Sequence, residues 1–484
     1  MTGRNLLLIG SACLWIICGA GARPCACQDG SQNGAQETLE SFAILPWDFH
    51  DGFGPKDTAV LKATTYRNID DYLERGSRAY EPFDSGFAGI AECGYNFSGF
   101  VSGPEGIEAS RKNGLKCVVY PKIDMFDSRG LSDEQLTAKC AEMDAAFKKA
   151  VEETKDDPCV WGYCLTDEPG AQYNLSMAAA SAAIRKYAPG KFIYVNLFPN
   201  TAPTTLQVGD RSPYGAKSYK EFLERFIREV KPDVLSYDNY EVEYSDDLRN
   251  PNRGIAHFTN LFEIRAAALE YGIPFWFVGS GVSLRSYSSP PSYARLALQT
   301  YTALAAGARG ITWYHYYPVG RDASAVDARG ARTVYWDYMK TVNGEARAIG
   351  SYLESFRSTE VGTTDLWPNV EQKLPPVPNN VLVNLKTELS RQGGYSDADA
   401  AREIKLMVGE FADGSDGNRV AALTVNLNVG VSVRVKFDSP AGYGPPKTVS
   451  PVSGREEEPA PEELEEGFWI LPGCGKLFVF ERAK

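Results

Sequence analysis

The stretch Val160-Trp161-Gly162-Tyr163-Cys164-Leu165-Thr166-Asp167-Glu168-Pro169-Gly170 decides the predicted fold. A short apolar run ends in two adjacent carboxylates, which proline and glycine follow at once. Because a strand that enters a Pro-Gly turn cannot continue, Asp167 and Glu168 should lie at the carboxyl end of a buried strand. In a barrel of parallel strands, catalytic residues gather at that end. The pair is therefore a candidate acid site, and the alternative interpretation is a solvated pair on the surface.

Similar apolar runs alternate with longer helical patterns along most of the chain. This alternation is typical of βα units around a parallel sheet, and eight such units match an α/β fold, the (β/α)8 TIM barrel. A doubly wound sheet would also alternate, but it normally carries a Gly-rich phosphate loop, which this sequence lacks. The predicted strands are residues 42–47, 96–101, 115–120, 159–165, 192–197, 234–237, 275–278 and 310–314.

The first 22 residues have the pattern of a secretory signal peptide. Arg4 is followed by an apolar stretch over residues 6–18 and by small residues at 20–22, which suits export to the periplasm or the medium. The apolar stretch is too short for a comfortable membrane span. A lipid anchor at Cys18 or Cys25 is the less favoured alternative, since neither cysteine follows a small residue.

The remaining chain divides into three predicted segments. Residues 23–38 are polar and rich in Gly and Gln, which predicts a flexible N-terminus, and residues 39–356 form the barrel. In residues 357–484 the pattern changes to short strand-like runs of alternating apolar and polar residues, separated by turns such as Asp-Gly. This pattern predicts a small antiparallel β-sandwich. The acidic run over residues 455–466 is expected to be a solvated loop. The predicted sandwich strands are residues 404–411, 420–427, 431–437, 468–471 and 477–480.

Charge and cysteine usage exclude several classes of protein. A formal net charge of -12 without a basic stripe argues against nucleic acid as a partner. Three scattered histidines and the lack of CxxC spacing disfavour a metal site, and no cofactor motif is present. Cys140 and Cys159 flank one predicted helix and could pair in an oxidising compartment.

Carboxylates, amides and aromatic rings follow the predicted strands. Aromatic faces pack against pyranose rings while polar side chains bond the hydroxyls, so this mixture predicts a carbohydrate site. Two carboxylates could then cleave a glycosidic bond. Structural roles remain the alternative for several of these side chains, because strand residues alternate in and out. The predicted substrate-binding residues are Trp47, Asp48, Asn96, Asp124, Asp167, Asn196, Tyr240, Trp313, His315 and Tyr316.

Three motifs follow one another along the predicted barrel: LTDEPG at 165–170, LSYDNY at 235–240 and ITWYHYYP at 311–318. The predicted sandwich comes after them. This order resembles the (β/α)8 clan of retaining glycoside hydrolases, and most of all β-galactosidase-like secreted bacterial proteins. The resemblance implies Glu168 as the acid/base, with Asp167 where the clan has Asn. The clan's nucleophile is a Glu at the end of strand seven, where this chain has Gly279-Ser280 and no acid.

The missing acid leaves three hypotheses. In the first, Asp238 supplies the second carboxylate of a glycosidase, with Glu241 and Glu243 as weaker candidates, and the carboxylate separation decides between retention and inversion. In the second, the barrel binds carbohydrate without cleaving it. In the third, the protein is an exported structural or partner-binding protein whose sandwich is the working surface.

Overall fold

The computed structural model describes residues 42–50, 83–205, 213–244, 248, 250–282, 292–317, 324–326, 332–389, 403–414 and 417–483. The predicted signal peptide and flexible N-terminus lie outside these residues. Among the helices that are described, none is long and apolar enough to cross a membrane.

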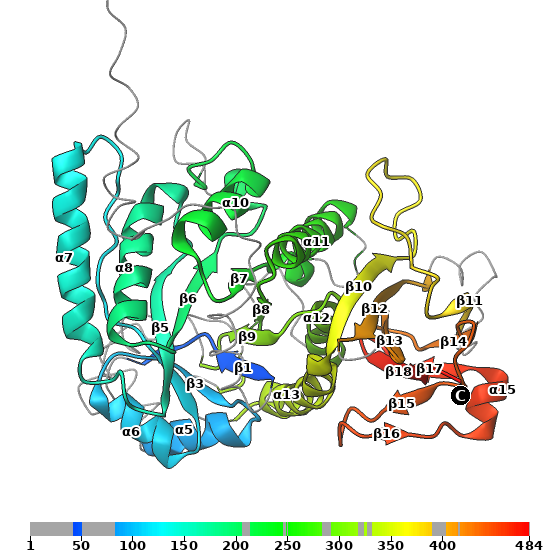
Figure 1. Cartoon of the computed structure of the whole chain (residues 1–484). Coiled ribbons are helices and arrows are strands. Elements are labelled where there is room, and N and C mark those ends of the chain that lie inside the picture. Colours follow the sequence, from blue (N-terminus) through cyan, green and yellow to red (C-terminus); the bar gives the residue numbers. More distant parts are fainter. Residues whose placement is uncertain are drawn as a thin grey trace, which may run out of the picture.

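The first part of the chain is a closed barrel of parallel strands (Figure 1). The sheet order runs β1-β9-β8-β7-β6-β5-β4-β3-β2. Since β1 pairs with β9 and β2, two residues further on, pairs with β3, the two act as one strand that closes the ring. All eight predicted strands are confirmed. The strands are β1 (Ala43–Pro46), β2 (Phe49–His50), β3 (Phe97–Val101), β4 (Lys116–Val119), β5 (Val160–Asp167), β6 (Phe192–Leu197), β7 (Leu235–Asp238), β8 (Phe275–Ser280) and β9 (Gly310–Tyr314).

Helices surround the barrel, and their ends follow local sequence signals. Ser132 caps α7 with a reciprocal capping box to Gln135, as the sequence predicts. Gly307, with φ +93°, takes up the left-handed turn after α12. The helices are α5 (Phe83–Glu92), α6 (Pro104–Lys112), α7 (Asp133–Val151), α8 (Asn174–Tyr187), α9 (Ala202–Thr205), α10 (Tyr219–Val230), α11 (Pro251–Tyr271), α12 (Tyr293–Ala305) and α13 (Val334–Tyr352), with short 3₁₀ turns η1 (Ala171–Tyr173), η2 (Glu241–Tyr244) and η3 (Leu353–Ser355).

Aromatic side chains fill the interior of the barrel below its mouth. The rings of Trp161 and Trp276 stack with centroids 5.5 Å apart, and Phe192 packs against both. Trp47 lies higher in the same interior, with its ring centroid 4.8 Å from that of Phe100. This packed interior provides a rigid floor for the polar groups above it.

Two antiparallel sheets follow the barrel and form the sandwich. The larger sheet has the order β10-β12-β13-β18-β15-β16 and the smaller one β11-β14-β17. Phe437 and Phe468 of the smaller sheet pack against Phe478 of the larger one. The strands are β10 (Phe356–Thr363), β11 (Val383–Leu389), β12 (Leu406–Asp413), β13 (Arg419–Asn426), β14 (Val433–Asp438), β15 (Lys447–Val449), β16 (Glu456–Glu457), β17 (Phe468–Ile470) and β18 (Gly475–Glu481).

Barrel helix α12 packs directly on the larger sheet (Figure 1). The approach at β12 is so close that a Cβ on Gly409 would lie 1.9 Å from the carbonyl oxygen of Ala305. The two parts of the chain therefore share one packed core.

Two sequence predictions are wrong: the one for the acidic run of the sandwich, and the one for a pair of cysteines in the barrel. The acidic run is not only loop, since it contains β16 and the helix α15 (Pro461–Glu466), which begins with proline and two glutamates that favour a helix N-terminus. Cys140 and Cys159 do not form a disulfide with each other, and the Cys159 thiol faces the carbonyl oxygen of Leu115 at 3.2 Å.

Candidate active site

The candidate site begins where β5 ends at the barrel mouth. The backbone N–H of Glu168 donates to the carbonyl oxygen of Asn196 at 2.9 Å, which ties the end of β5 to β6. Glu168 has a φ of +45°, an uncommon backbone conformation for a residue with a side chain. Such strain is found at functional sites more often than elsewhere, and here it sets the direction in which the Glu168 carboxyl points.

Glu168 and Asp238 meet across the mouth. Their carboxyl groups are within hydrogen-bonding distance of each other, although β6 separates the two strands that carry them. Asp238 is buried, with 6% of its surface exposed, and Glu168 is partly exposed. Two carboxylates in contact cannot both be ionised without a large repulsion, so the contact requires a shared proton.

The side-chain amide of Asn196 bonds two of the acids at the mouth. The Nδ2 atom of Asn196 donates to Asp167 Oδ1 at 3.1 Å and to Asp238 Oδ1 at 3.3 Å. Asn196 itself is 3% exposed. The amide therefore donates to carboxyl groups on β5 and β7, the strands on either side of its own strand β6.

Two further side chains fix the orientation of that amide. Ser236 Oγ donates to Asn196 Oδ1 at 3.1 Å, and the hydroxyl of Tyr194 bonds to Ser236 Oγ at 2.7 Å. Ser236 and Tyr194 are fully buried. Neither residue is among the predicted site residues, although a serine and a tyrosine inside apolar strands are a usable signal, because a buried hydroxyl needs a partner.

Burial sets the protonation of the three acids. It raises the pKa of Asp238 well above its ordinary value, and the negative charges of Glu168 and Asp167 raise it further. Burial and the charge of Asp167 raise the pKa of Glu168 to about 7, against the hydrogen bond from Asp238 that lowers it. Near neutral pH, Asp238 therefore holds its proton and Glu168 is poised to gain or lose one.

Asp167 is the most exposed of the three acids. The surrounding protein raises its pKa to about 6, while the hydrogen bond from Asn196 and the charge of His315 lower it. Because the residue is exposed, solvent screens part of this effect. Asp167 is thus the acid most available to a ligand.

Asp48 positions His315 beside this cluster. Its Oδ2 accepts the backbone N–H of Tyr316 at 2.9 Å, and its Oδ1 lies 3.4 Å from His315 Nδ1. Asp48 therefore holds the imidazole from one side while the ring acts electrostatically on Asp167 from the other.

Two tyrosines complete the described part of the mouth. The rings of Tyr240 and Tyr314 lie with centroids 5.4 Å apart. Burial raises the pKa of Tyr240, and the charges of Asp238, Asp167 and Glu168 raise it further. Of the polar and aromatic residues that the sequence predicts for one rim, the structure brings together Asp48, Asp167, Glu168, Asn196, Asp238, Tyr240 and His315.

Other predicted site residues lie elsewhere. Asn96 was predicted at the mouth but precedes β3, at the opposite end of the barrel, where its side chain bonds the backbone of Phe42 and Ile44. Asp124 is exposed in the loop after β4. Glu241 pairs with Arg253 at 2.6 Å, and the side chain of Glu243 lies outside the described part.

The predicted aromatic platforms are packed into the core. Trp47 is 4% exposed inside the barrel. Trp313 is fully buried and its indole N–H donates to Asn343 Oδ1 at 2.9 Å. Tyr316 is 2% exposed and its hydroxyl accepts from the indole of Trp336 at 3.0 Å. None of these three rings has a face open to a sugar.

The end of β8 holds no acid. The backbone N–H of Ser280 donates to Gln299 Oε1 at 2.8 Å, and the Ser280 hydroxyl donates to the carbonyl oxygen of Val282 at 2.7 Å. Across the described residues 275–282, no side chain carries a carboxyl group. Within the described chain, no group of three or more His, Cys, Asp or Glu is arranged to hold a metal ion.

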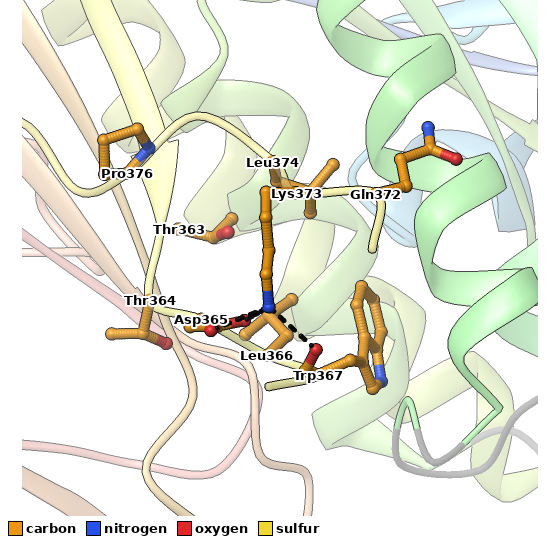
Figure 2. Close-up of a pocket in the computed structure, with 9 residues that line it drawn as sticks. All are labelled: Thr363, Thr364, Asp365, Leu366, Trp367, Gln372, Lys373, Leu374 and Pro376. Carbon is orange, nitrogen blue, oxygen red and sulfur yellow. Dashed lines mark hydrogen bonds and ion pairs between the residues drawn. The ribbon is translucent and has the colours of Figure 1, made fainter. Parts of the chain in front are cut away.

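A cavity of about 300 Å³ lies outside the barrel mouth, beside β10 (Figure 2). Lys373 points into it but is already paired with Asp365 at 2.9 Å and with the carbonyl oxygen of Trp367 at 3.2 Å. None of the predicted site residues lines this cavity.

No family model matches the chain, and no curated protein matches it. Among solved structures, a glycoside hydrolase family 5 protein from Bacteroides vulgatus is 12% identical, with a TM-score of 0.44 over 91% of this chain and 89% of its own. A β-galactosidase from Halorubrum lacusprofundi is 12% identical, with a TM-score of 0.41 over 63% of this chain and 58% of its own. A conserved exported protein from Bacteroides fragilis is 11% identical, with a TM-score of 0.42 over 77% and 78%.

These similarities are remote, and the fold follows from the strand order of this chain itself. It is a (β/α)8 barrel followed by an antiparallel β-sandwich.

Proposed function

We propose that this protein is an exported glycoside hydrolase in which Glu168 is the general acid/base and Asp238 is the second carboxylate. The observation that carries the proposal is the carboxyl contact between these residues at the barrel mouth, together with the pKa of about 7 for Glu168. A general acid works best when its pKa is close to the working pH, and an ordinary surface glutamate does not meet this condition.

Glu168 would donate its proton to the oxygen of the glycosidic bond as that bond breaks. The ionised Glu168 would then accept a proton from the water that attacks the sugar carbon, which restores the acid. Each turnover thus adds one water molecule, and no metal or organic cofactor takes part in either step. The partial burial of Glu168 favours the protonated form that the first step needs.

Asp238 would act on Glu168 and not on the sugar. A buried carboxyl that keeps its proton is neither a nucleophile nor a base. Asp238 would therefore stabilise Glu168 by a hydrogen bond after Glu168 has given up its proton.

Asp167 would face the substrate. Its exposed carboxylate, held by Asn196 and flanked by His315, lies next in sequence to the acid. The transition state of glycoside hydrolysis carries positive charge on the sugar ring, and a fixed carboxylate stabilises such charge. Tyr240 and Tyr314 would supply ring faces and a hydroxyl for the sugar.

A carbohydrate-binding barrel without hydrolysis is the second candidate. The observation that favours it is the lack of any carboxyl at the described end of β8, where Ser280 is instead bonded to Gln299. Binding would then use the same aromatic and polar groups without bond cleavage.

A glycan screen distinguishes the two candidates. We expect wild-type protein to release reducing ends from at least one oligo- or polysaccharide, and Glu168→Gln to bind that glycan without cleaving it. Binding by calorimetry with no cleavage of any glycan would favour the second candidate. A cleaving Glu168→Gln variant would remove Glu168 from the proposed role.

A further inference from the structure

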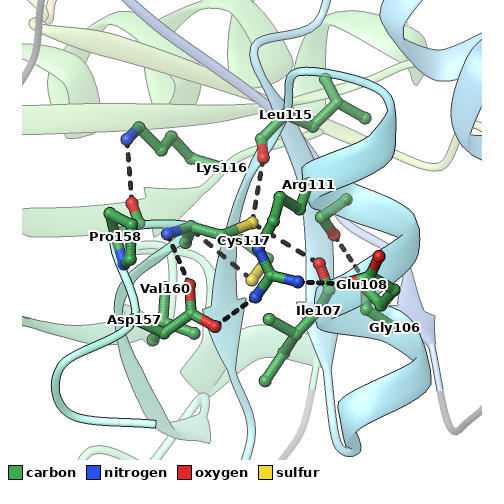
Figure 3. A network of polar contacts seen from close by, with 12 residues as sticks. Gly106, Ile107, Glu108, Arg111, Leu115, Lys116, Cys117, Asp157, Pro158 and Val160 are labelled. Carbon is green, nitrogen blue, oxygen red and sulfur yellow. Dashed lines mark hydrogen bonds and ion pairs between the residues drawn. The ribbon is translucent and has the colours of Figure 1, made fainter.

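A pair of buried cysteines lies at the start of two neighbouring barrel strands, away from the acid site. Cys117 is on β4 (Figure 3). Cys159 immediately precedes β5. Cys117 is fully buried and Cys159 is 6% exposed. The proposed hydrolysis uses neither thiol.

The backbone brings the two residues within bonding range. The N–H of Cys117 donates to the carbonyl oxygen of Cys159 at 3.0 Å, and Cys117 Sγ lies 3.7 Å from the same oxygen. Cys159 Sγ in turn lies 3.2 Å from the carbonyl oxygen of Leu115, two residues before Cys117. Hydrogen-bonded strands run about 4.8 Å apart, and disulfides span Cα separations of about 4.4–6.8 Å, so little backbone movement is needed to join them.

The surroundings make the two thiols unequal. The hydrogen bond from Cys117 lowers the pKa of Cys159, and the charges of Arg111 and Lys116 lower it further, against burial and the charge of Asp157. The same hydrogen bond, with burial, raises the pKa of Cys117. Cys159 is therefore the thiol that ionises first and attacks first.

Three other described cysteines make their contacts away from this pair. Cys93 Sγ lies 3.6 Å from the carbonyl oxygen of Trp336, and Cys474 Sγ lies 3.6 Å from the hydroxyl of Tyr293. Cys164 Sγ lies 4.0 Å from the carbonyl oxygen of Thr166.

We propose that Cys117 and Cys159 form a disulfide when the chain folds in the presence of a disulfide oxidant, such as oxidised glutathione or a protein oxidant of the same chemistry. The Cys159 thiolate attacks the oxidant and releases one thiol, which leaves a mixed disulfide on Cys159. The Cys117 sulfur then attacks the Cys159 sulfur and releases the second thiol. The protein loses two hydrogen atoms and two electrons, and the oxidant gains them.

The bond would close a loop that contains the whole of α7, since the two residues are 42 positions apart. It would also fasten β4 to β5, the strand that ends in Asp167 and Glu168. A cross-link of this span restricts the unfolded chain and stabilises the fold.

Non-reducing peptide mapping tests the proposal on the full-length chain. The protein is refolded with reduced and oxidised glutathione, its remaining thiols are alkylated in denaturant, and it is digested with trypsin. Cleavage after Lys116 and Lys122 isolates Cys117, cleavage after Lys139 isolates Cys140, and residues 156–185 carry both Cys159 and Cys164. We expect peptide 117–122 linked to peptide 156–185, and the link lost on reduction.

Matched variants identify the partner. The link should persist in Cys164→Ser and Cys140→Ser and disappear in Cys159→Ser, and oxidised wild-type protein should melt a few degrees above its reduced form. Recovery of peptide 117–122 in alkylated form after oxidative refolding would overturn the proposal. A link from Cys117 to peptide 140–148, or one lost in Cys164→Ser, would do so as well. Mapping of the wild-type protein decides the question even if a variant fails to fold.

Discussion

The carboxyl groups of Glu168 and Asp238 share a hydrogen bond across the barrel mouth, although their strands are not neighbours in the sheet. The strand between them supplies Asn196, whose amide bonds Asp238 directly at 3.3 Å and Asp167 at 3.1 Å. Three consecutive strands thus carry one connected set of acids. Its chemistry depends on which member holds the proton.

The pH dependence of activity should be bell-shaped, with a maximum between about pH 6 and 7. Asp167 stabilises positive charge only when it is ionised, so activity rises as the pH passes its pKa of about 6. Glu168 donates a proton only when it is protonated, so activity falls as the pH passes its pKa of about 7. Initial rates on the best glycan across pH 4–9 measure this, and a rate still rising above about pH 8 would contradict the protonated role of Glu168.

Glu168→Gln should be more stable than the wild type at pH 8. The pKa of Glu168 is raised from 4.5 to about 7 in the folded protein, so the folded state holds this proton more tightly than the unfolded state. Its stabilising contribution is complete below about pH 4.5 and is lost as the pH rises through about 7. Glutamine cannot ionise, so we expect a gain of about 1–3 kcal/mol at pH 8 and almost none at pH 4.

Chemical denaturation at both pH values measures the difference. Glu270→Gln, an exposed position at the end of α11, is the matched control and should behave as wild type at both. A loss of stability in Glu168→Gln at pH 8 would show that the carboxyl is held by favourable contacts and that its pKa is not raised.

Ser236→Ala should weaken catalysis without unfolding the barrel. The variant removes the donor to Asn196 Oδ1, so the amide is no longer held with its N–H bonds toward Asp167 and Asp238. The loss of one buried hydrogen bond costs about 1–2 kcal/mol, and we expect kcat to fall about tenfold, with a displaced pH optimum. Ser98→Ala is the control, because Ser98 is also fully buried in a barrel strand and bonds to Ser110 instead. Equal pH profiles for the two variants would exclude a positioning role for Ser236.

Gly409→Ala should separate the sandwich from the barrel. The new Cβ would lie 1.9 Å from the carbonyl oxygen of Ala305, and backbone on both sides must move. Such overpacking costs about 1–3 kcal/mol, so Tm should fall. Gly444→Ala, whose nearest neighbouring atom is 3.8 Å away, is the control in the same domain. An unchanged Tm in Gly409→Ala would mean that β12 does not rest on α12.

The barrel is predictable from sequence because each strand is a short apolar run that stops at polar or turn residues. Asp167, Glu168, Asn196 and Asp238 follow this pattern, and the structure brings them together. In the sandwich, β10 and β11 were missed because charged residues alternate with apolar ones along exposed faces. The helix α15 was also not predicted, because the proline and glutamates that favour its start lie inside a run of negatively charged residues.

The predicted positions of some site residues differ from the structure because the direction of a side chain is not visible in the sequence. Asn96 begins a strand and so lies at the opposite end from the mouth. Trp313 is on a mouth-forming strand but faces α13, since alternate strand residues point outward. Ser236 and Tyr194 were missed for the reverse reason: their importance comes from contacts between strands, which a single sequence does not reveal.

The most direct test of Glu168 as the acid compares leaving groups. Aryl glycosides of the sugar found in the glycan screen are prepared with poor leaving groups, such as unsubstituted phenol, and with very good ones, such as dinitrophenol. A general acid contributes about 10²–10⁴-fold when the departing oxygen needs a proton and little when it does not. We therefore expect Glu168→Gln to lose at least about 100-fold in kcat/KM on the phenyl glycoside and less than about tenfold on the dinitrophenyl glycoside. An equal loss on both substrates, or no loss on either, would contradict the assignment of Glu168.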